Sequence, residues 1–326
     1  MAGVLNNGQI ISDLWIDAPD ARQILDRKLS AGLVTPEEAD AIASFIENGY
    51  VIIDIGNVDA VADNIWSSID ILWQNPPTDL VAAGHVNGGR PLPMDRLANQ
   101  LQRGPGVRIL DCHSHVPGAY SLYLNTALHR MCNLLFGHRC VATQSLLFEY
   151  GSTQDLHRDP WYVNHTPRSH LLAAWIALED IHPDSGPLTY VPKSHRLPYF
   201  EFSTGDIVFH DPRVKALERT QALAHMKQAC AEAGLAPQAF CPRKGQALIW
   251  HASLVHGGSP VNNPALTRRS LVVHYGREDT HGRRGAGITV NDKAHTFFTT
   301  KKYSSAAGTI GYFNPLAGLE QTSWGV

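Results

Sequence analysis

The spacing of apolar residues predicts helices in the first third of the chain. Between Ala39 and Ile46 apolar residues recur at intervals of three and four, which places them on one face of a helix. The preceding Thr35-Pro36-Glu37-Glu38 offers an N-cap residue, a proline suited to the first turn and a glutamate that can complete a capping box. We therefore expect a helix from Thr35 to Gly49, and similar patterns predict helices over residues 58–73 and 121–136.

A different pattern begins near Ala142, where short apolar runs rich in β-branched and aromatic residues alternate with turn signals. A run of this kind also follows the first helix, at residues 50–53. The runs after Ala142 cover residues 144–150, 171–178, 186–191, 246–250 and 270–275. Short strands of this kind are typical of a β-sandwich or barrel, here with helices packed outside it.

No Gly/Ser-rich or charged linker divides the 326 residues, so we expect a single domain. Its first part, residues 1–140, is mainly helical and includes one long Pro/Gly-rich loop from Asn75 to Tyr120 that could form a lid. The β core covers residues 141–276 and carries a helical insertion at residues 213–234. A C-terminal extension covers residues 277–326.

Composition narrows the class of partner. The formal net charge is −3 and no long basic run occurs, so nucleic acid is not an expected partner. No apolar stretch is long enough for a membrane span, and the N-terminus lacks the features of a secretory signal. The five cysteines form no C-x-x-C pair, which favours reduced thiols in a cytoplasm. Nothing in the sequence determines the oligomeric state.

Candidate chemistry lies in and after the β core. His157 and Asp159 are two residues apart, so an extended backbone sends both side chains to one face while Arg158 points away. A third candidate, His256, follows the apolar run 246–250, and a glycine pair after it lets the backbone approach a ligand. Two histidines and a carboxylate are the protein ligands of many non-haem Fe(II) oxygenases. Arg268 opens the next predicted strand, where a guanidinium could bind a carboxylate.

Four sequence blocks occur in the order found in the phytanoyl-CoA dioxygenase (PhyH-like) family, which the stretch from Gln144 to Tyr275 resembles. The blocks are Gln144-Ser145, His157-x-Asp159, Gly186-Pro187-Leu188 running into Val191-Pro192-Lys193-Ser194-His195, and His256-Gly257-Gly258-Ser259 followed by Arg268. The resemblance implies a double-stranded β-helix, a jelly roll of the cupin-like type. The N-terminal 140 residues carry no matching motif.

The resemblance also implies a function: a dioxygenase that uses Fe(II), 2-oxoglutarate and O2 to hydroxylate a small organic substrate. It implies that the metal ligands are His157, Asp159 and His256. It further implies that Arg268, helped by Ser259, binds the distal carboxylate of 2-oxoglutarate, with Trp175 and Gln144 facing the same pocket. The aspartate argues for hydroxylation, or for desaturation or epoxidation, because related halogenases have a small residue at its position.

Two departures from the family pattern affect these assignments. Lys193 stands where the family usually has glycine, which alters a turn. Gly257 and Gly258 both precede Ser259 where one glycine is common, so Arg269 is an alternative to Arg268. His251 could compete as a ligand, although a structural role suits it better. The residues that flank the metal motif could contact substrate; they are Arg158, Trp161, Tyr162, His165 and Arg168.

Other functions keep the same ligands. A metal-binding jelly roll could act as a hydrolase or isomerase, but it would leave Arg268 without a role. A sensor or binding module could retain the fold without catalysis, and the helical first third would then offer a surface for a partner. Dependence on 2-oxoglutarate distinguishes the oxygenase from both alternatives.

Overall fold

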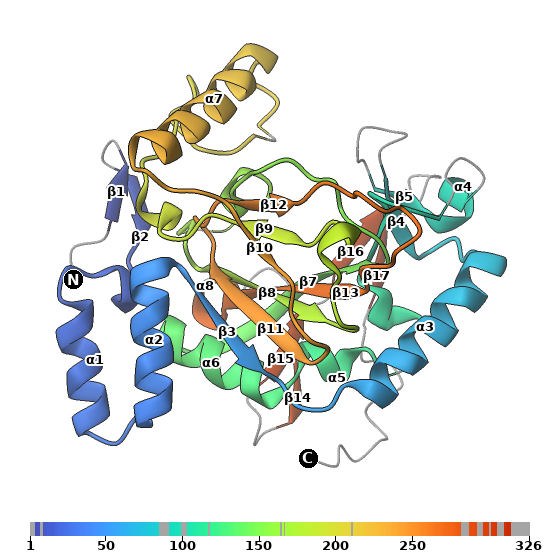
Figure 1. Ribbon diagram of the computed structural model, residues 1–326, viewed down its shortest axis with the longest axis horizontal. Coiled ribbons are helices and arrows are strands. Elements are labelled where there is room, and N and C mark those ends of the chain that lie inside the picture. Colours follow the sequence, from blue (N-terminus) through green and yellow to red (C-terminus); the bar gives the residue numbers. More distant parts are fainter. Residues whose placement is uncertain are drawn as a thin grey trace.

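The computed structural model describes residues 4–6, 9–84, 91–98, 103–116, 118–163, 165, 167–209, 211–281, 287–291, 296–299, 301–304 and 310–313. Its centre is a large sheet in which strands follow the order β3-β11-β8-β13-β7-β6-β4-β5, with β15 and β14 continuing beside β7 (Figure 1). The main strands are β3 (Tyr50–Asp54), β11 (Gln246–His251), β8 (Leu171–Ala177), β13 (Ser270–Arg277) and β7 (Cys140–Phe148). The shorter ones are β6 (Arg108–Leu110), β4 (Val81–Ala83), β5 (Leu92–Pro93), β14 (Gly287–Asn291) and β15 (Thr296–Thr299).

A second, three-stranded sheet has the order β10-β9-β12. Its strands are β10 (Gln238–Phe240), β9 (Leu188–Tyr190) and β12 (His256–Gly258). Leu188, Tyr190 and Phe240 from this sheet belong to one apolar cluster with Trp175 and Leu248 of the large sheet. Two sheets that share an apolar interior make the jelly-roll core, so the predicted mainly β fold with flanking helices is confirmed.

The central strand β8 shows why its sequence lacks the alternation of a half-exposed strand. All seven residues are buried, because apolar groups cover both faces of the sheet at this point. Leu172, Ala174 and Ile176 face the cluster beneath the helices. Ala173 and Trp175 face the interior between the two sheets. Residues of odd number on β8 therefore point toward the interior of the jelly roll.

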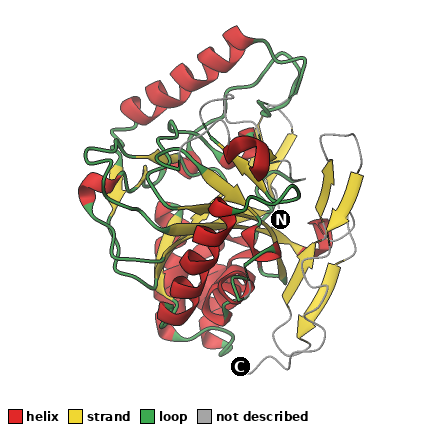
Figure 2. Ribbon diagram, turned by 90° about the vertical axis from the view of Figure 1, so that its right-hand side faces the viewer, coloured by secondary structure: helices red, strands yellow, loops and turns green. Residues whose placement is uncertain are grey.

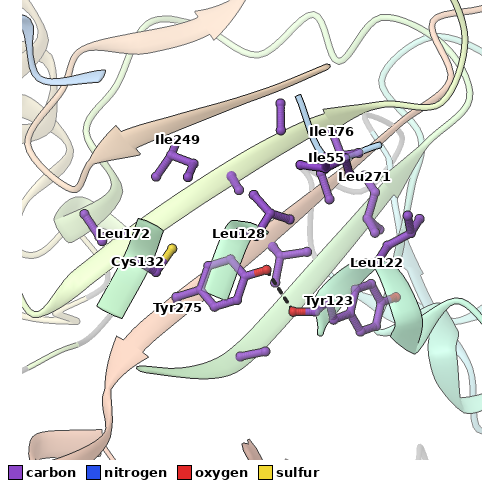
Figure 3. Packing of buried hydrophobic residues seen from close by; sticks show 14 of the residues in the cluster. Ile55, Leu122, Tyr123, Leu128, Cys132, Leu172, Ile176, Ile249, Leu271 and Tyr275 are labelled. Carbon is purple, nitrogen blue, oxygen red and sulfur yellow. Dashed lines mark hydrogen bonds between the residues drawn. The ribbon is translucent and has the colours of Figure 1, made fainter. Parts of the chain in front are cut away.

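Helices cover the outer face of the large sheet. They are α1 (Ala21–Ser30), α2 (Pro36–Asn48), α3 (Asp59–Gln74), α5 (Tyr120–Tyr123) and α6 (Thr126–Phe136). Thr35 forms the expected capping box at the start of α2, and Gly49 ends that helix in the left-handed conformation. Figure 3 shows α6 residues such as Leu128 and Cys132 packed against strand residues such as Leu172 and Ile249. None of the described helices is both long and apolar enough to cross a membrane.

The helix α7 (Ala216–Glu232) lies on the other side of the molecule, at the top of Figures 1 and 2. Its buried residues Ala222 and Met226 pack in a third apolar cluster with Trp161, Phe202 and Phe209. Trp161 and Phe209 stack with ring centroids 4.3 Å apart. Because Trp161 follows Asp159 by two residues, this cluster supports the segment that carries the metal motif.

The structure corrects two expectations. Residues 121–136 form two helices, because Asn125 caps α6 through the amides of Ala127 and Leu128 and thereby ends α5. The stretch from Asn75 to Tyr120, expected as one long loop, contains β4, β5, β6 and the helix α4 (Met94–Ala98). Within it, residues 85–90, 99–102 and 117 lie outside the described part of the chain. The C-terminal extension contains β14, β15, β16 (Lys301–Ser304) and β17 (Ile310–Phe313).

Tyr275 ties β13 to the helical layer. Its hydroxyl is fully buried and donates a hydrogen bond of 2.9 Å to the backbone carbonyl of Tyr123 (Figure 3). We expect Tyr275→Phe to lower the free energy of unfolding by about 1–3 kcal/mol, because the buried carbonyl loses its donor. Urea unfolding measures this change. An unchanged midpoint would mean that the carbonyl finds another partner.

Candidate metal centre

His157 and His256 are placed side by side by a short antiparallel bridge between their backbones. The amide of His157 donates to the carbonyl of His256 at 2.8 Å, and the reverse bond measures 3.0 Å. The two imidazole rings lie 4.3 Å apart between centroids. Asp159 starts a 3-10 turn, and its own amide donates to the carbonyl of Ala252. Backbone pairing between distant segments thus brings together the residues that the sequence predicts as ligands.

One donor atom from each of His157, Asp159 and His256 lies within 4.8 Å of the others. Asp159 Oδ1 is 3.4 Å from His256 Nε2 and 4.0 Å from His157 Nε2. Each Nδ1 is engaged by a backbone carbonyl, that of Asp155 for His157 and that of Leu254 for His256. The Nδ1 atoms are therefore the donors, and each Nε2 is left with the lone pair that a metal needs.

The neutral imidazole of His157 and the ionised carboxylate of Asp159 suit a cation. Burial, reinforced by the nearby His256, lowers the pKa of His157 to about 3, so this imidazole is neutral at pH 7. Burial acts to raise the pKa of Asp159, but His256 and His274 outweigh it and hold the pKa well below 3.8. For His256 the attraction of Asp159 outweighs burial and raises the pKa above 6.5. A buried carboxylate beside two imidazoles fits a divalent metal such as Fe(II).

Two residues that the sequence analysis did not identify orient Asp159. The indole N–H of Trp250 donates to Asp159 Oδ2 at 2.8 Å, which leaves Oδ1 facing the histidines. His274 Nε2 lies 3.7 Å from the same Oδ1, and its side chain is 5% exposed. The alternation along β13 could have identified His274, since it lies six residues after Arg268 and so faces the same side.

Arg268 lies on the interior side of the large sheet with almost no exposure to solvent, 1%. Its guanidinium carbon is 5.1 Å from the centroid of the Phe148 ring and 5.5 Å from that of Trp175. Burial lowers its pKa to about 9, so it remains a cation at pH 7. Among the described residues the guanidinium makes one hydrogen bond, from Nη1 to the carbonyl of Gly186, and Nε and Nη2 have no partner. A buried cation of this kind fits an anionic ligand.

Arg269 points in the opposite direction. Its guanidinium pairs with Glu149 at 3.4 Å and packs 4.7 Å from the ring of Trp66, on the helical side of the sheet. The two guanidinium groups therefore lie on opposite sides of the sheet, Arg268 beside Trp175 and Arg269 beside Trp66. The geometry thus favours Arg268 over Arg269 as the anchor for an anion.

The other residues predicted for the cosubstrate pocket are Trp175, Ser259 and Gln144, and they have different surroundings. Trp175 lies beside Arg268, as described above. The Ser259 hydroxyl hydrogen-bonds that of Thr189, and the Ser259 amide donates to the carbonyl of Pro187. Gln144 is the partner of His274 in the pairing of β7 with β13, which places both on the interior face. The structure brings Trp175 and Arg268 together and sets Gln144 nearer to the metal motif.

The residues that flank the motif have distinct surroundings. Arg158 points away from the metal cluster, as expected, and donates to the carbonyls of Pro198 and Ser194. Arg168 pairs with Asp206 and donates to the carbonyl of His165, so its guanidinium is bound by groups of the protein itself. Tyr162 is 39% exposed and meets the His157 ring edge-on at 5.4 Å. Of this group, Tyr162 is the residue placed beside the metal cluster with access to solvent.

His251 is engaged elsewhere, which supports the structural role predicted for it. Its Nε2 lies 3.2 Å from Asp17 Oδ2, and its Nδ1 accepts from the amide of Ser253. Lys193, which stands where the family usually has glycine, adopts φ 68° and keeps the left-handed turn that suits glycine. That substitution therefore leaves the turn in place.

The glycine pair after His256 has a steric reason. A Cβ on Gly257 would lie 2.8 Å from the carbonyl oxygen of Gln154. A Cβ on Gly258 would lie 2.5 Å from Ser152 Oγ and 3.0 Å from the amide nitrogen of Thr153. The loop of residues 152–155 therefore packs directly on the backbone of β12, and both glycines are required for that contact.

We expect Gly258→Ala to displace this loop and weaken metal binding by about 10–100-fold, because His157 follows the loop and its orientation depends on it. Binding of Co(II) followed by visible absorption measures the change. The double variant Gly258→Ala/Ser152→Ala removes the shortest of these contacts and should recover part of the loss. Wild-type affinity in the single variant would contradict the steric argument.

Fold and site together define a jelly-roll protein with a buried cluster of two histidines and one carboxylate. Residues 111–270 match the family model of phytanoyl-CoA dioxygenase (PhyH). This match agrees with the resemblance to the PhyH family that the sequence blocks indicate. No curated protein matches the chain in sequence.

Solved structures share the fold at low sequence identity. The non-haem alpha-ketoglutarate-dependent carbocyclase SnoK from nogalamycin biosynthesis has a TM-score of 0.52 and 18% identity, covering 76% of this chain and 86% of SnoK. EctD from S. alaskensis, solved with 2-oxoglutarate and 5-hydroxyectoine, has a TM-score of 0.52 and 19% identity over 76% of this chain and 77% of EctD. The epimerase SnoN, solved with Fe3+, alpha-ketoglutarate and nogalamycin RO, has a TM-score of 0.51 and 16% identity, covering 74% of this chain and 84% of SnoN.

Proposed function

We propose that the chain is an Fe(II)- and 2-oxoglutarate-dependent dioxygenase that hydroxylates an unactivated C–H bond of a small organic substrate. The observation that carries this proposal is the combination of the His157–Asp159–His256 cluster with the buried guanidinium of Arg268, whose Nε and Nη2 have no partner among the described residues. A metal-binding hydrolase would need the cluster but not the arginine. The fold neighbours SnoN and EctD were solved with this cosubstrate, and SnoN also with iron, which agrees with the proposal.

His157, Asp159 and His256 would hold the metal on one side and leave the opposite side for small molecules. With O2 and 2-oxoglutarate, Fe(II) supplies the oxidation of the C–H bond, and the coproducts are succinate and CO2. Trp250 and His274 would fix the orientation of Asp159, so that one carboxylate oxygen is presented to the metal. Arg268 would hold the far carboxylate of 2-oxoglutarate in an interior that excludes water.

The side of the cluster near Tyr162 is the approach for the substrate under this proposal. Tyr162 is in part exposed beside His157, whereas Arg268 is fully buried. The cosubstrate would thus occupy the deep end and the organic substrate the open end. Hydroxylation is our preferred outcome, and the carbocyclase and epimerase among the neighbours indicate how the same fold can serve other oxidations.

The direct test is an anaerobic titration of the Fe(II)-loaded protein with 2-oxoglutarate, followed by visible absorption. A weak metal-to-ligand charge-transfer band that grows and saturates is expected, because the keto acid chelates the iron. Iron bound without such a band would favour the hydrolase, isomerase or sensor alternatives. A substrate screen by mass spectrometry then tests hydroxylation through the gain of one oxygen atom from O2 and the release of succinate.

A further inference from the structure

The loop that packs on Gly257 and Gly258 carries a side chain to which the proposed function assigns no role. The carboxamide nitrogen of Gln154 lies 3.2 Å from His157 Nε2. Because His157 Nδ1 donates its proton to the carbonyl of Asp155, Nε2 holds the lone pair. Gln154 is therefore the donor in this bond, and its amide points at the nitrogen atom to which a metal would bind.

The backbone of Gln154 is held in place from two sides. Its carbonyl accepts from the amide of Gly258 at 2.8 Å, and the packing of β12 against the loop leaves no room for a Cβ at Gly257. The preceding residue, Thr153, has φ 50°, a left-handed conformation that costs a non-glycine residue roughly 1 kcal/mol or more. A strained backbone that the surroundings enforce directs the Gln154 amide to the metal cluster.

A metal on His157 would take the lone pair to which Gln154 now donates. The amide would then be a half-buried donor without its acceptor, and its fixed backbone would keep it beside the open side of the metal. Leaving such a donor unpaired is costly, and a carboxylate oxygen is its best replacement partner. Arg268 is buried in the interior and would bind the far carboxylate of a keto acid, so the carboxylate nearer the metal remains for Gln154, which already contacts the ligand His157.

We propose that Gln154 is a binding residue for the cosubstrate, donating a hydrogen bond to the metal-side carboxylate of 2-oxoglutarate. This inference rests on the proposed function. The protein would then hold the keto acid at both ends, by Gln154 at the metal and by Arg268 in the interior. The glycine pair, which departs from the usual family pattern, is the feature that lets the loop come close enough.

The test compares wild type, Gln154→Leu and Gln154→Ala as Fe(II)-loaded proteins in the anaerobic 2-oxoglutarate titration. Both variants should bind 2-oxoglutarate about 10-fold more weakly or worse, which corresponds to the loss of a hydrogen bond to a charged group. Their affinity for Co(II) without keto acid should equal or exceed that of wild type, because the amide no longer competes for His157. Gln228→Leu on the exposed side of α7 is the matched control and should behave as wild type.

Pyruvate distinguishes the two ends of the cosubstrate, since it has the keto acid group but lacks the far carboxylate. The loss caused by Gln154→Leu should persist with pyruvate, whereas the loss caused by Arg268→Ala should disappear. Unchanged 2-oxoglutarate affinity in the Gln154 variants would overturn the inference, as would a loss of Co(II) affinity or an effect absent with pyruvate. A wild-type protein that binds Fe(II) but gives no charge-transfer band would instead overturn the proposed function itself.

Discussion

Replacing Asp159 by alanine is expected to abolish turnover and to weaken Fe(II) binding. The loss of affinity should exceed 100-fold, because changing a residue that merely contacts a metal ligand already costs roughly 10–100-fold. Asp159 supplies the one negative charge of the cluster, and its Oδ1 lies within 4.0 Å of Nε2 of both histidines. Without it, two neutral imidazoles alone would hold the cation. Anaerobic Fe(II) titration and succinate release measure the two effects.

Asp155→Ala is the matched control for this variant, because the Asp155 side chain is exposed in the same loop while its backbone carbonyl holds His157. The control should retain metal binding. Thermal unfolding of the apo Asp159→Ala protein checks that the chain still folds. Wild-type Fe(II) affinity in Asp159→Ala would mean that a different carboxylate serves the metal.

Replacing Arg268 by alanine should raise the 2-oxoglutarate concentration needed for half-saturation by an amount equivalent to about 2–5 kcal/mol, typical for removing one member of a buried charged pair. Fe(II) affinity without keto acid should stay the same, because Arg268 does not contact the ligand cluster among the described contacts. The charge-transfer titration gives both numbers. Arg269→Ala is the control, and an effect in that variant alone would reverse the assignment.

Removing the charge of Arg268 is expected to impair 2-oxoglutarate binding but not the stability of the fold. A buried guanidinium with two nitrogens that have no partner among the described residues destabilises the protein without keto acid, because burial removes its hydration. Arg268→Met, which keeps much of the volume without the charge, should therefore leave the unfolding free energy unchanged or increase it while 2-oxoglutarate binding is lost. Urea unfolding of the apo protein would reveal this trade between stability and function.

Sequence patterns predicted the features that depend on nearby residues. The capping box at Thr35 was predictable because its partners lie within one turn, and His157 and Asp159 because an extended segment places alternate side chains together. His256 and Arg268 required the order of the family blocks. Their grouping with the first two depends on strand pairing, which the local sequence does not specify.

Apart from the cap of Asn125 on α6, which is local, the contacts that were missed join distant segments. Trp250 reaches Asp159 across 91 positions, and His274 does so from a strand on the other side of β8. Gln154 and the glycine pair meet only when the loop before His157 packs on β12. In the stretch from Asn75 to Tyr120, β4 and β6 are too short to show a period, and they become strands through pairing that extends to β7.

The backbone bridge between His157 and His256 has a thermodynamic consequence. The two residues are about a hundred positions apart in the chain, so an ion bound to both would cross-link segments whose meeting costs considerable loop entropy. Because the ion binds the folded state, it stabilises that state, and the stabilisation grows as the concentration of free ion rises above the dissociation constant. Amide protons of the bridge should exchange with solvent more slowly once the ion is present, so that occupancy can be followed by hydrogen exchange without any knowledge of the substrate.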